Sequence, residues 1–168
     1  MNQNSIDPQK DADTDRPAAG TWNDDSAVFG FNRLAIIDIE HSHQPLRWGP
    51  EDNPTRYAMT FNGEIYNYLE LRAELEQLGH IFRTDSDTEV LLEAHAEWGT
   101  AAYDRFNGMF AFAIYEHESG RLVLGRDRLG IKPLYLSWTP RRLRFASSLP
   151  ALLAAMVLTL RRPAPRAA

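Results

Sequence analysis

Residues 61–67 decide the fold of this chain and read Phe61-Asn62-Gly63-Glu64-Ile65-Tyr66-Asn67. The run 57–61 that leads into them is mostly apolar or aromatic and predicts a buried strand. We expect this strand to stop at Asn62-Gly63, because an Asn-Gly pair readily adopts a left-handed turn. Polar backbone and side chains would then gather at the end of the strand, where they can meet a ligand.

Two helices are predicted downstream of this stretch. Apolar residues recur at helical spacing over 68–78 and again over 87–98, and a glycine follows each segment. Ser86 and Glu89 have the spacing of a capping box at the start of the second helix. Upstream, the apolar and β-branched run 34–37 predicts another buried strand.

Two hairpins are predicted in the second half of the chain. Residues 109–115 and 121–125 flank a turn that ends in Gly120, and residues 134–138 and 143–146 flank a second turn. Strands joined by hairpins, with few helices between them, favour an α+β domain whose sheets are largely antiparallel.

The length of 168 residues suits one compact domain. Residues 1–20 are polar and acidic, and we expect them to be disordered. The folded domain is expected over residues 21–155. Residues 156–168 end in arginines, prolines and alanines and are expected to form a basic unstructured tail.

Composition excludes several classes of function. A net charge of -5 argues against a nucleic-acid partner, and the absence of cysteine removes disulfides, thiolate metal sites and cysteine nucleophiles. The N-terminus lacks the apolar core of a secretory signal. The apolar run 151–160 is about half of the roughly 20 residues that a membrane helix needs. We therefore expect a cytoplasmic protein that contacts neither nucleic acid nor membrane.

His41 and His43 are two residues apart and could face the same way. No third ligand stands nearby, and a protein zinc site uses at least three protein ligands. We interpret both as solvated loop residues, and no metal site is predicted.

Six blocks resemble the glutaminase domain of glutamine-hydrolysing asparagine synthetases, which are class II amidotransferases with an N-terminal nucleophile. They are Asn32-Arg33-Leu34-Ala35-Ile36-Ile37-Asp38, His43-Gln44-Pro45-Leu46, Phe61-Asn62-Gly63-Glu64-Ile65-Tyr66-Asn67, Ser86-Asp87-Thr88-Glu89-Val90, Gly108-Met109-Phe110-Ala111-Phe112-Ala113 and Arg126-Asp127-Arg128-Leu129-Gly130-Ile131-Lys132-Pro133-Leu134-Tyr135. The resemblance implies an αββα sandwich of two antiparallel sheets flanked by helices, as in Ntn hydrolases. The first strand that is usual in this family is not recognisable in this sequence.

The resemblance implies a pocket for glutamine. Arg33 would hold the α-carboxylate, because a guanidinium can meet two carboxylate oxygens at once. Asp87 would bind the α-ammonium and stay ionised at a helix start, where the helix dipole favours negative charge. Backbone carbonyls around Ile36 and Ile37 would help with the amino group. A strand-edge arginine and a helix-start aspartate are the ordinary structural alternatives.

Asn62 and Gly63 would form the oxyanion hole of the same pocket. A side-chain amide and a backbone N–H aimed at a developing oxyanion stabilise it more than they stabilise the planar amide. Glu64 would lie beside them and order the substrate ammonium. The alternative for Asn62-Gly63 is an ordinary turn. For Arg126-Asp127, which this pocket leaves without a role, the default interpretation is an internal ion pair.

The family's nucleophile is an N-terminal cysteine, and this sequence contains none. The lineage reaction is glutamine hydrolysis that supplies ammonia for ATP-dependent amidation of aspartate, so we expect this chain to be inactive or truncated. It should carry no cofactor, since ATP and Mg²⁺ belong to the family's synthetase domain. Expected partners are glutamine and a synthetase domain or homologous chain, including a homodimer. The alternatives are a non-catalytic glutamine-binding or regulatory module, and the glutaminase domain of an N-acetylglutaminylglutamine-type amidotransferase.

Overall fold

The computed structural model describes residues 18–33, 44–50 and 53–160, with backbone alone at 18–19, 32–33 and 157–160. The elements are β1 (Ala18–Asn23), β2 (Val28–Arg33), β3 (Leu46–Trp48), β4 (Tyr57–Ile65), α1 (Tyr68–Gln77), α2 (Asp87–Trp98), the 3₁₀ helix η1 (Gly99–Arg105), β5 (Gly108–Glu116), β6 (Arg121–Arg126), β7 (Tyr135–Thr139), β8 (Arg142–Ala146) and α3 (Leu149–Leu160).

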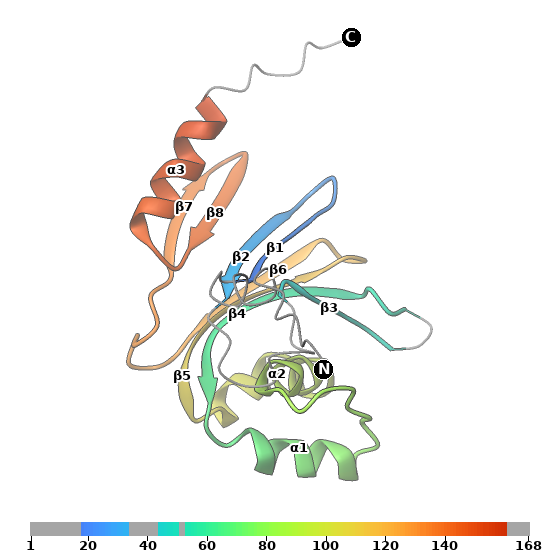
Figure 1. The fold of residues 1–168 in the computed structure, drawn as a ribbon. Helices are drawn as coiled ribbons and strands as arrows, with labels where there is room; N and C mark the ends of the chain where they lie inside the picture. Colours follow the sequence, from blue (N-terminus) through green and yellow to red (C-terminus); the bar gives the residue numbers. More distant parts are fainter. Residues whose placement is uncertain (1–17, 34–43, 51–52, 161–168) are drawn as a thin grey trace, which may run out of the picture.

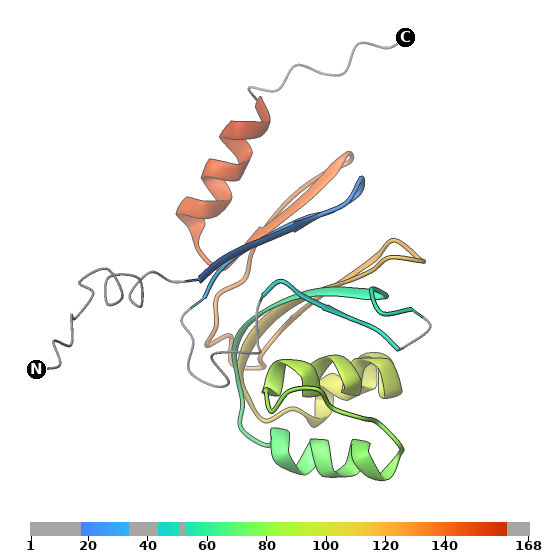
Figure 2. The same cartoon turned by 45° about the vertical axis from the view of Figure 1, so that its right-hand side comes forward.

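These elements stack in four layers (Figures 1 and 2). Helices α1 and α2 cover one face of an antiparallel sheet of order β3-β4-β5-β6. The hairpins β1-β2 and β7-β8 lie over the other face, and α3 packs against β7-β8 from outside. This is the expected α+β arrangement of helix, β layer, β layer and helix. Among the described residues the second β layer consists of two separate hairpins.

The helix-facing side of the sheet holds the larger hydrophobic core. Leu75 of α1, Leu91 of α2 and Ile114 of β5 are almost completely buried there. A smaller core joins the other face of the sheet to the hairpins. In it Phe29 of β2 packs on Ala58 and Ala113, and its ring lies 5.5 Å from that of Phe145 in β8. The apolar side chains of the sheet thus divide between its two faces by the alternation of strand residues.

Strand β4 does not stop at Asn62-Gly63, so the expected turn there is wrong. The strand continues to Ile65, and Gly63 pairs with Phe110 in a regular antiparallel ladder. Gly63 has φ 149°, and a Cβ at this position would lie 2.1 Å from the carbonyl oxygen of Met109. Glycine is needed here because the chain of β5 approaches too closely for any side chain.

The other predicted elements agree with the structure, apart from their limits. Both helices and both hairpins are present, and Gly120 has the positive φ of 65° that its turn requires. Strand β1 begins at Ala18, inside the segment expected to be disordered, and α3 continues to Leu160, past the expected boundary at 155. The strand expected over 34–37 lies outside the described residues.

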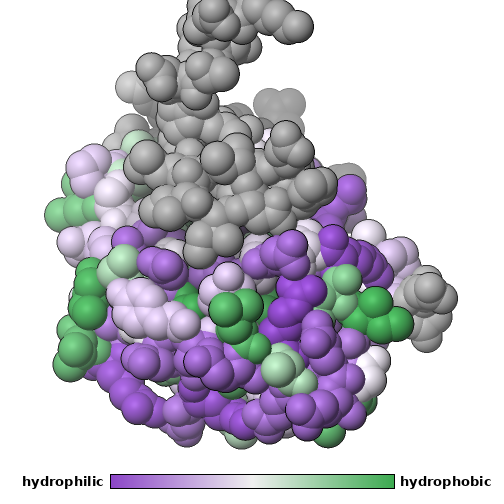
Figure 3. Space-filling view, turned by 60° about the horizontal axis from the view of Figure 1, so that its bottom comes forward, coloured by the Kyte–Doolittle hydropathy of each residue, from purple (hydrophilic) through white to green (hydrophobic). Residues whose placement is uncertain are grey.

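One apolar face of the β7-β8 hairpin is covered at one end only. Leu136, Trp138, Leu143 and Phe145 share a face because Leu136 pairs with Phe145 and Trp138 with Leu143. Phe145 reaches the smaller core, whereas the Trp138 side chain is 82% exposed. By contrast, the surface around α1 and α2 is mainly hydrophilic with scattered apolar side chains (Figure 3). Within the described residues no helix is long and apolar enough to cross a membrane.

Candidate functional site

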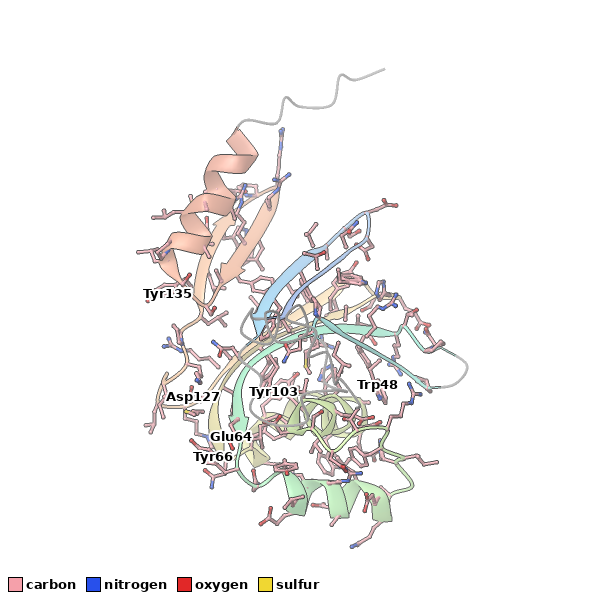
Figure 4. The ribbon with its side chains drawn as sticks, viewed as in Figure 1. Trp48, Glu64, Tyr66, Tyr103, Asp127 and Tyr135 are labelled. Carbon is pink, nitrogen blue, oxygen red and sulfur yellow. The ribbon has the colours of Figure 1, made fainter. Side chains whose placement is uncertain are left out.

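A cavity of about 940 Å³ lies between the sheet and the hairpin layer. Among the described residues, the charged ones in its lining are Glu64 at the end of β4 (Figure 4), Asp87 at the start of α2, and Lys132 in the loop before β7. Among the described side chains, those that β1, β2, β8 and α3 contribute are uncharged and mostly small: Gly20, Thr21, Val28, Gly30, Phe31, Phe145, Ala146, Ala151 and Ala155. A volume of this size is ample for an amino acid.

Backbone N–H groups of β4 face the cavity edge in a regular series. The Phe61 N–H donates to Oε1 of Gln44 at 2.7 Å, and the Ile65 N–H donates to Oδ2 of Asp87 at 3.0 Å. Alternate residues of a strand direct their N–H groups to the same side, so the Gly63 N–H points to this edge as well. The ladder with β3 on this side of β4 ends at Met59, and no described loop or side-chain group accepts a hydrogen bond from the Gly63 N–H. Gly63 therefore presents a backbone donor between two that are already occupied.

Side chains of β4 alternate between the core and the cavity. Phe61 and Ile65 belong to the core beneath the helices. Asn62 and Glu64, which have the opposite parity, project toward the hairpin layer and line the cavity with Gly63. An amide side chain, a backbone N–H without a described acceptor, and a carboxylate thus come together along three consecutive residues.

Asp87 reaches the same edge from helix α2. The Ser86 Oγ accepts from the Glu89 N–H at 3.3 Å, which fixes the start of the helix. The Glu89 carboxylate bonds Arg83 N and Thr84 N rather than Ser86 N, so the expected capping box is only half formed. Asp87 is only 5% exposed.

The ionisation of Asp87 differs from the expectation that a helix start favours its charged form. Burial raises the pKa of the Asp87 carboxyl, and the charge of Glu64 adds to the rise, although hydrogen bonds from Ile65 and Thr88 oppose it. A cation bound beside Asp87 would relieve this penalty, because an opposite charge favours the ionised carboxylate.

Arg126 and Asp127 do not pair with each other, so the interpretation as an internal ion pair is wrong. The buried Asp127 carboxylate accepts backbone N–H groups from Phe110 and from Leu129, Ile131 and Lys132 at 2.9–3.2 Å. Burial alone would raise the pKa of Asp127, but these donors outweigh it and hold the pKa below its ordinary value. The Arg126 Nε donates to the Lys132 carbonyl at 2.6 Å. Both side chains hold the loop that carries Lys132.

Of the remaining predicted site residues, the structure describes only the backbone of Arg33. Arg33 is the last residue of β2 and pairs with Ala18, and its side chain is not described. Ile36 and Ile37 lie outside the described residues, as do His41 and His43. The structure therefore brings Asn62, Gly63, Glu64 and Asp87 to one cavity. In the described ranges no group of three His, Cys, Asp or Glu side chains is suited to hold a metal ion.

Gln44 and Lys132 are among the cavity residues that sequence reasoning did not place in the site. Both lie in blocks that carry the resemblance, which is the signal that could have found them. The local sequence around neither residue indicates its role. Gln44 accepts a hydrogen bond from Phe61, 17 residues away, and the position of Lys132 is fixed by the Asp127 carboxylate.

Two antiparallel β layers with an amide, a backbone donor and carboxylates in the intervening cavity are the arrangement expected of a glutamine amidotransferase domain. The family model described as "Glutamine amidotransferase domain" matches residues 6–163, and the chain belongs to this family. Its fold resembles that of the glutamine phosphoribosylpyrophosphate amidotransferase from B. subtilis complexed with ADP and GMP, with a TM-score of 0.60, 27% identity and coverage of 71% of this chain and 27% of that one.

Curated relatives are asparagine synthetases [glutamine-hydrolyzing]. A putative one from Mycobacterium tuberculosis (strain ATCC 25618 / H37Rv) is 54% identical over 125 residues, which cover 71% of this chain and 19% of the relative. Asparagine synthetase 1 from Bacillus subtilis is 43% identical over 155 residues, which cover 92% and 23%. Asparagine synthetase B from Escherichia coli is 38% identical over 135 residues, which cover 80% and 24%. The chain thus spans less than a quarter of the length of these relatives.

Proposed function

We propose that this domain binds L-glutamine in the cavity between its β layers. The observation that carries the proposal is the Gly63 N–H, for which no described residue is an acceptor and which stands between the two occupied donors of Phe61 and Ile65. Such a donor, next to the Asn62 amide, suits a negative oxygen that develops on the side-chain amide of glutamine.

The two ends of the amino acid meet opposite charges in this proposal. Asp87 and Glu64 face the α-ammonium, whose charge offsets the unfavourable burial of the Asp87 carboxylate. Arg33 at the end of β2 binds the α-carboxylate, since a planar guanidinium matches a carboxylate. Backbone carbonyls near Ile36 and Ile37 assist at the ammonium.

The proposed chemistry stops short of a covalent step within this chain. A thioester route needs a thiolate, and the sequence has no cysteine. The chain therefore binds and polarises the amide, and a glutaminase assay on it should release no ammonia above background. The lineage reaction, in which ammonia is used to amidate aspartate or a similar carboxylate with ATP and Mg²⁺, would require a partner synthetase domain.

Isothermal titration calorimetry with L-glutamine tests the proposal directly. The wild-type chain is expected to bind with a Kd of roughly 1 mM or tighter, and Arg33→Ala and Asp87→Ala are each expected to weaken binding at least about tenfold. Arg141→Ala, in the exposed β7-β8 turn, is the control and should bind like the wild type. The absence of any saturable binding by a folded wild-type chain would refute the proposal.

A further inference from the structure

Lys132 is the one cationic side chain among the described residues that line the cavity. It shares this lining with the carboxylates of Glu64 and Asp87. No described carboxylate forms an ion pair with the Lys132 ammonium, although the side chain is half-buried. A cation in this position is available to a ligand.

The backbone of Lys132 is fixed on both sides. Its N–H donates to Asp127 at 3.0 Å, and its carbonyl accepts from Arg126 Nε at 2.6 Å. Arg126 also donates to the carbonyl of Gly130, and Asp127 accepts from the N–H of Ile131 at 2.9 Å. A loop held by this many bonds presents its lysine to the cavity without a large ordering penalty on binding.

We propose that Lys132 binds the α-carboxylate of the amino acid and thereby selects free amino acids over α-amides and peptide-linked residues. This inference rests on the proposed function, in which Arg33 meets the same carboxylate. A carboxylate has two oxygens and can accept from two cationic side chains.

The charge balance of the cavity favours a zwitterion as the ligand. Two carboxylates and one ammonium among the described lining residues would repel a phosphate or a dicarboxylate but complement separated positive and negative groups. The ligand class is therefore an α-amino acid with a free carboxyl and a free amino group.

Calorimetry with two ligands tests the role of Lys132. L-Glutamine carries the α-carboxylate, and L-glutaminamide replaces it by an uncharged amide. Lys132→Gln is expected to weaken L-glutamine binding roughly 10-fold to 100-fold and L-glutaminamide binding less than about twofold, because only the former loses a charge-assisted hydrogen bond. Lys132→Arg should retain most of the affinity for L-glutamine.

The matched control is Arg128→Gln, which removes a positive charge from the same loop at a residue outside the cavity lining. It should bind both ligands as the wild type does. An equal loss of both ligands in Lys132→Gln, or no loss of either, would overturn the inference while leaving the proposed function intact. A folded wild-type chain that binds neither ligand would overturn both.

Discussion

The two faces of the central sheet differ in how tightly their side chains are packed. On the helix-facing side, side chains such as Leu91 and Ile114 are packed without exposure. On the hairpin-facing side a smaller core stands beside a cavity that Glu64 and Lys132 line and that Asp87 reaches from the start of α2. The helix-facing side of β4 therefore contributes most of the apolar packing, and the other side lines the cavity. Substitutions on the two sides should differ in their effects on folding stability and on ligand binding.

Paired glycine substitutions should give the largest effect. Gly63→Ala places a Cβ 2.1 Å from the Met109 carbonyl oxygen at φ 149°, and we expect a loss of about 4 kcal/mol in the free energy of unfolding. Gly30→Ala is the control on the hairpin layer, where a Cβ meets nothing within 4 Å, and its change should stay within about 0.5 kcal/mol. Urea denaturation measures both. Equal losses would show that the hairpin layer is as tightly constrained as the sheet.

Paired leucine substitutions test the packing of the two sides. Leu91→Ala removes a completely buried side chain of α2 and should cost about 3 kcal/mol, through lost burial and the cavity left behind. Leu136→Ala, at a β7 residue that is 55% exposed, should cost less than about 0.5 kcal/mol. Denaturant midpoints at constant slope provide the measurement. A large loss for Leu136 would indicate that its hairpin face is covered in solution.

His80 should make the stability of the helix-facing side depend on pH. Its Nδ1 lies 2.6 Å from Glu93 and its Nε2 lies 2.9 Å from Glu97. Burial would lower the pKa of His80, but the bonds to Glu97 and Glu93 outweigh it and raise the pKa. Because the folded-state pKa is raised, the contribution is complete below the unfolded value of about 6.5 and is lost as pH rises through the folded value.

The corresponding variant is His80→Gln. It should be less stable than the wild type by about 1 kcal/mol at pH 5.5 to 6, with a smaller difference at pH 9. Thermal unfolding across this range measures the difference. A stability difference between the two proteins that increases toward high pH would contradict the assigned ion pairs.

Asp87→Asn should have the smallest effect on stability among the four test variants. It should change stability and ligand binding in opposite directions. Burial raises the pKa of Asp87, so the wild type loses stability as pH rises from the unfolded value of about 3.8, and the loss is complete above the folded-state pKa. The variant should melt about 2 °C higher than the wild type at pH 7, lose this advantage near pH 4, and bind L-glutamine more weakly. Lower stability at pH 7 would mean that the carboxylate charge supports the fold.

Local sequence signals predicted the elements that depend on local interactions. Leu71 and Leu75 mark the buried stripe of α1, and Ser86 marks the start of α2 by a bond to a residue three positions away. The resemblance also named the β4 residues and Asp87, which do share one cavity. The helix positions required no knowledge of distant partners, whereas the shared cavity was predicted from the resemblance.

The features that the sequence did not predict arise from distant contacts. Strand β4 continues through Gly63 because β5, some 47 residues further on at Phe110, supplies the ladder. The pKa of Asp87 is raised because the rest of the domain buries it. Asp127 follows an arginine in the sequence, yet its oxygens are used by backbone donors. Tertiary context overrides the local interpretation in each case.

The division of the outer β layer into two hairpins has a consequence for the timescale of motion. Strand β4 pairs with β5 along its whole length and with β3 over its first three residues, whereas β7 and β8 bond only each other among the described strands. Opening a two-stranded ribbon breaks one ladder, and opening β4 breaks two. The amide protons of the β7-β8 ladder should therefore exchange with solvent well before those of β4 and β5. Local opening of the domain would begin at the β7-β8 hairpin, which forms part of the cavity wall. A ligand can then enter there while the central sheet remains hydrogen-bonded.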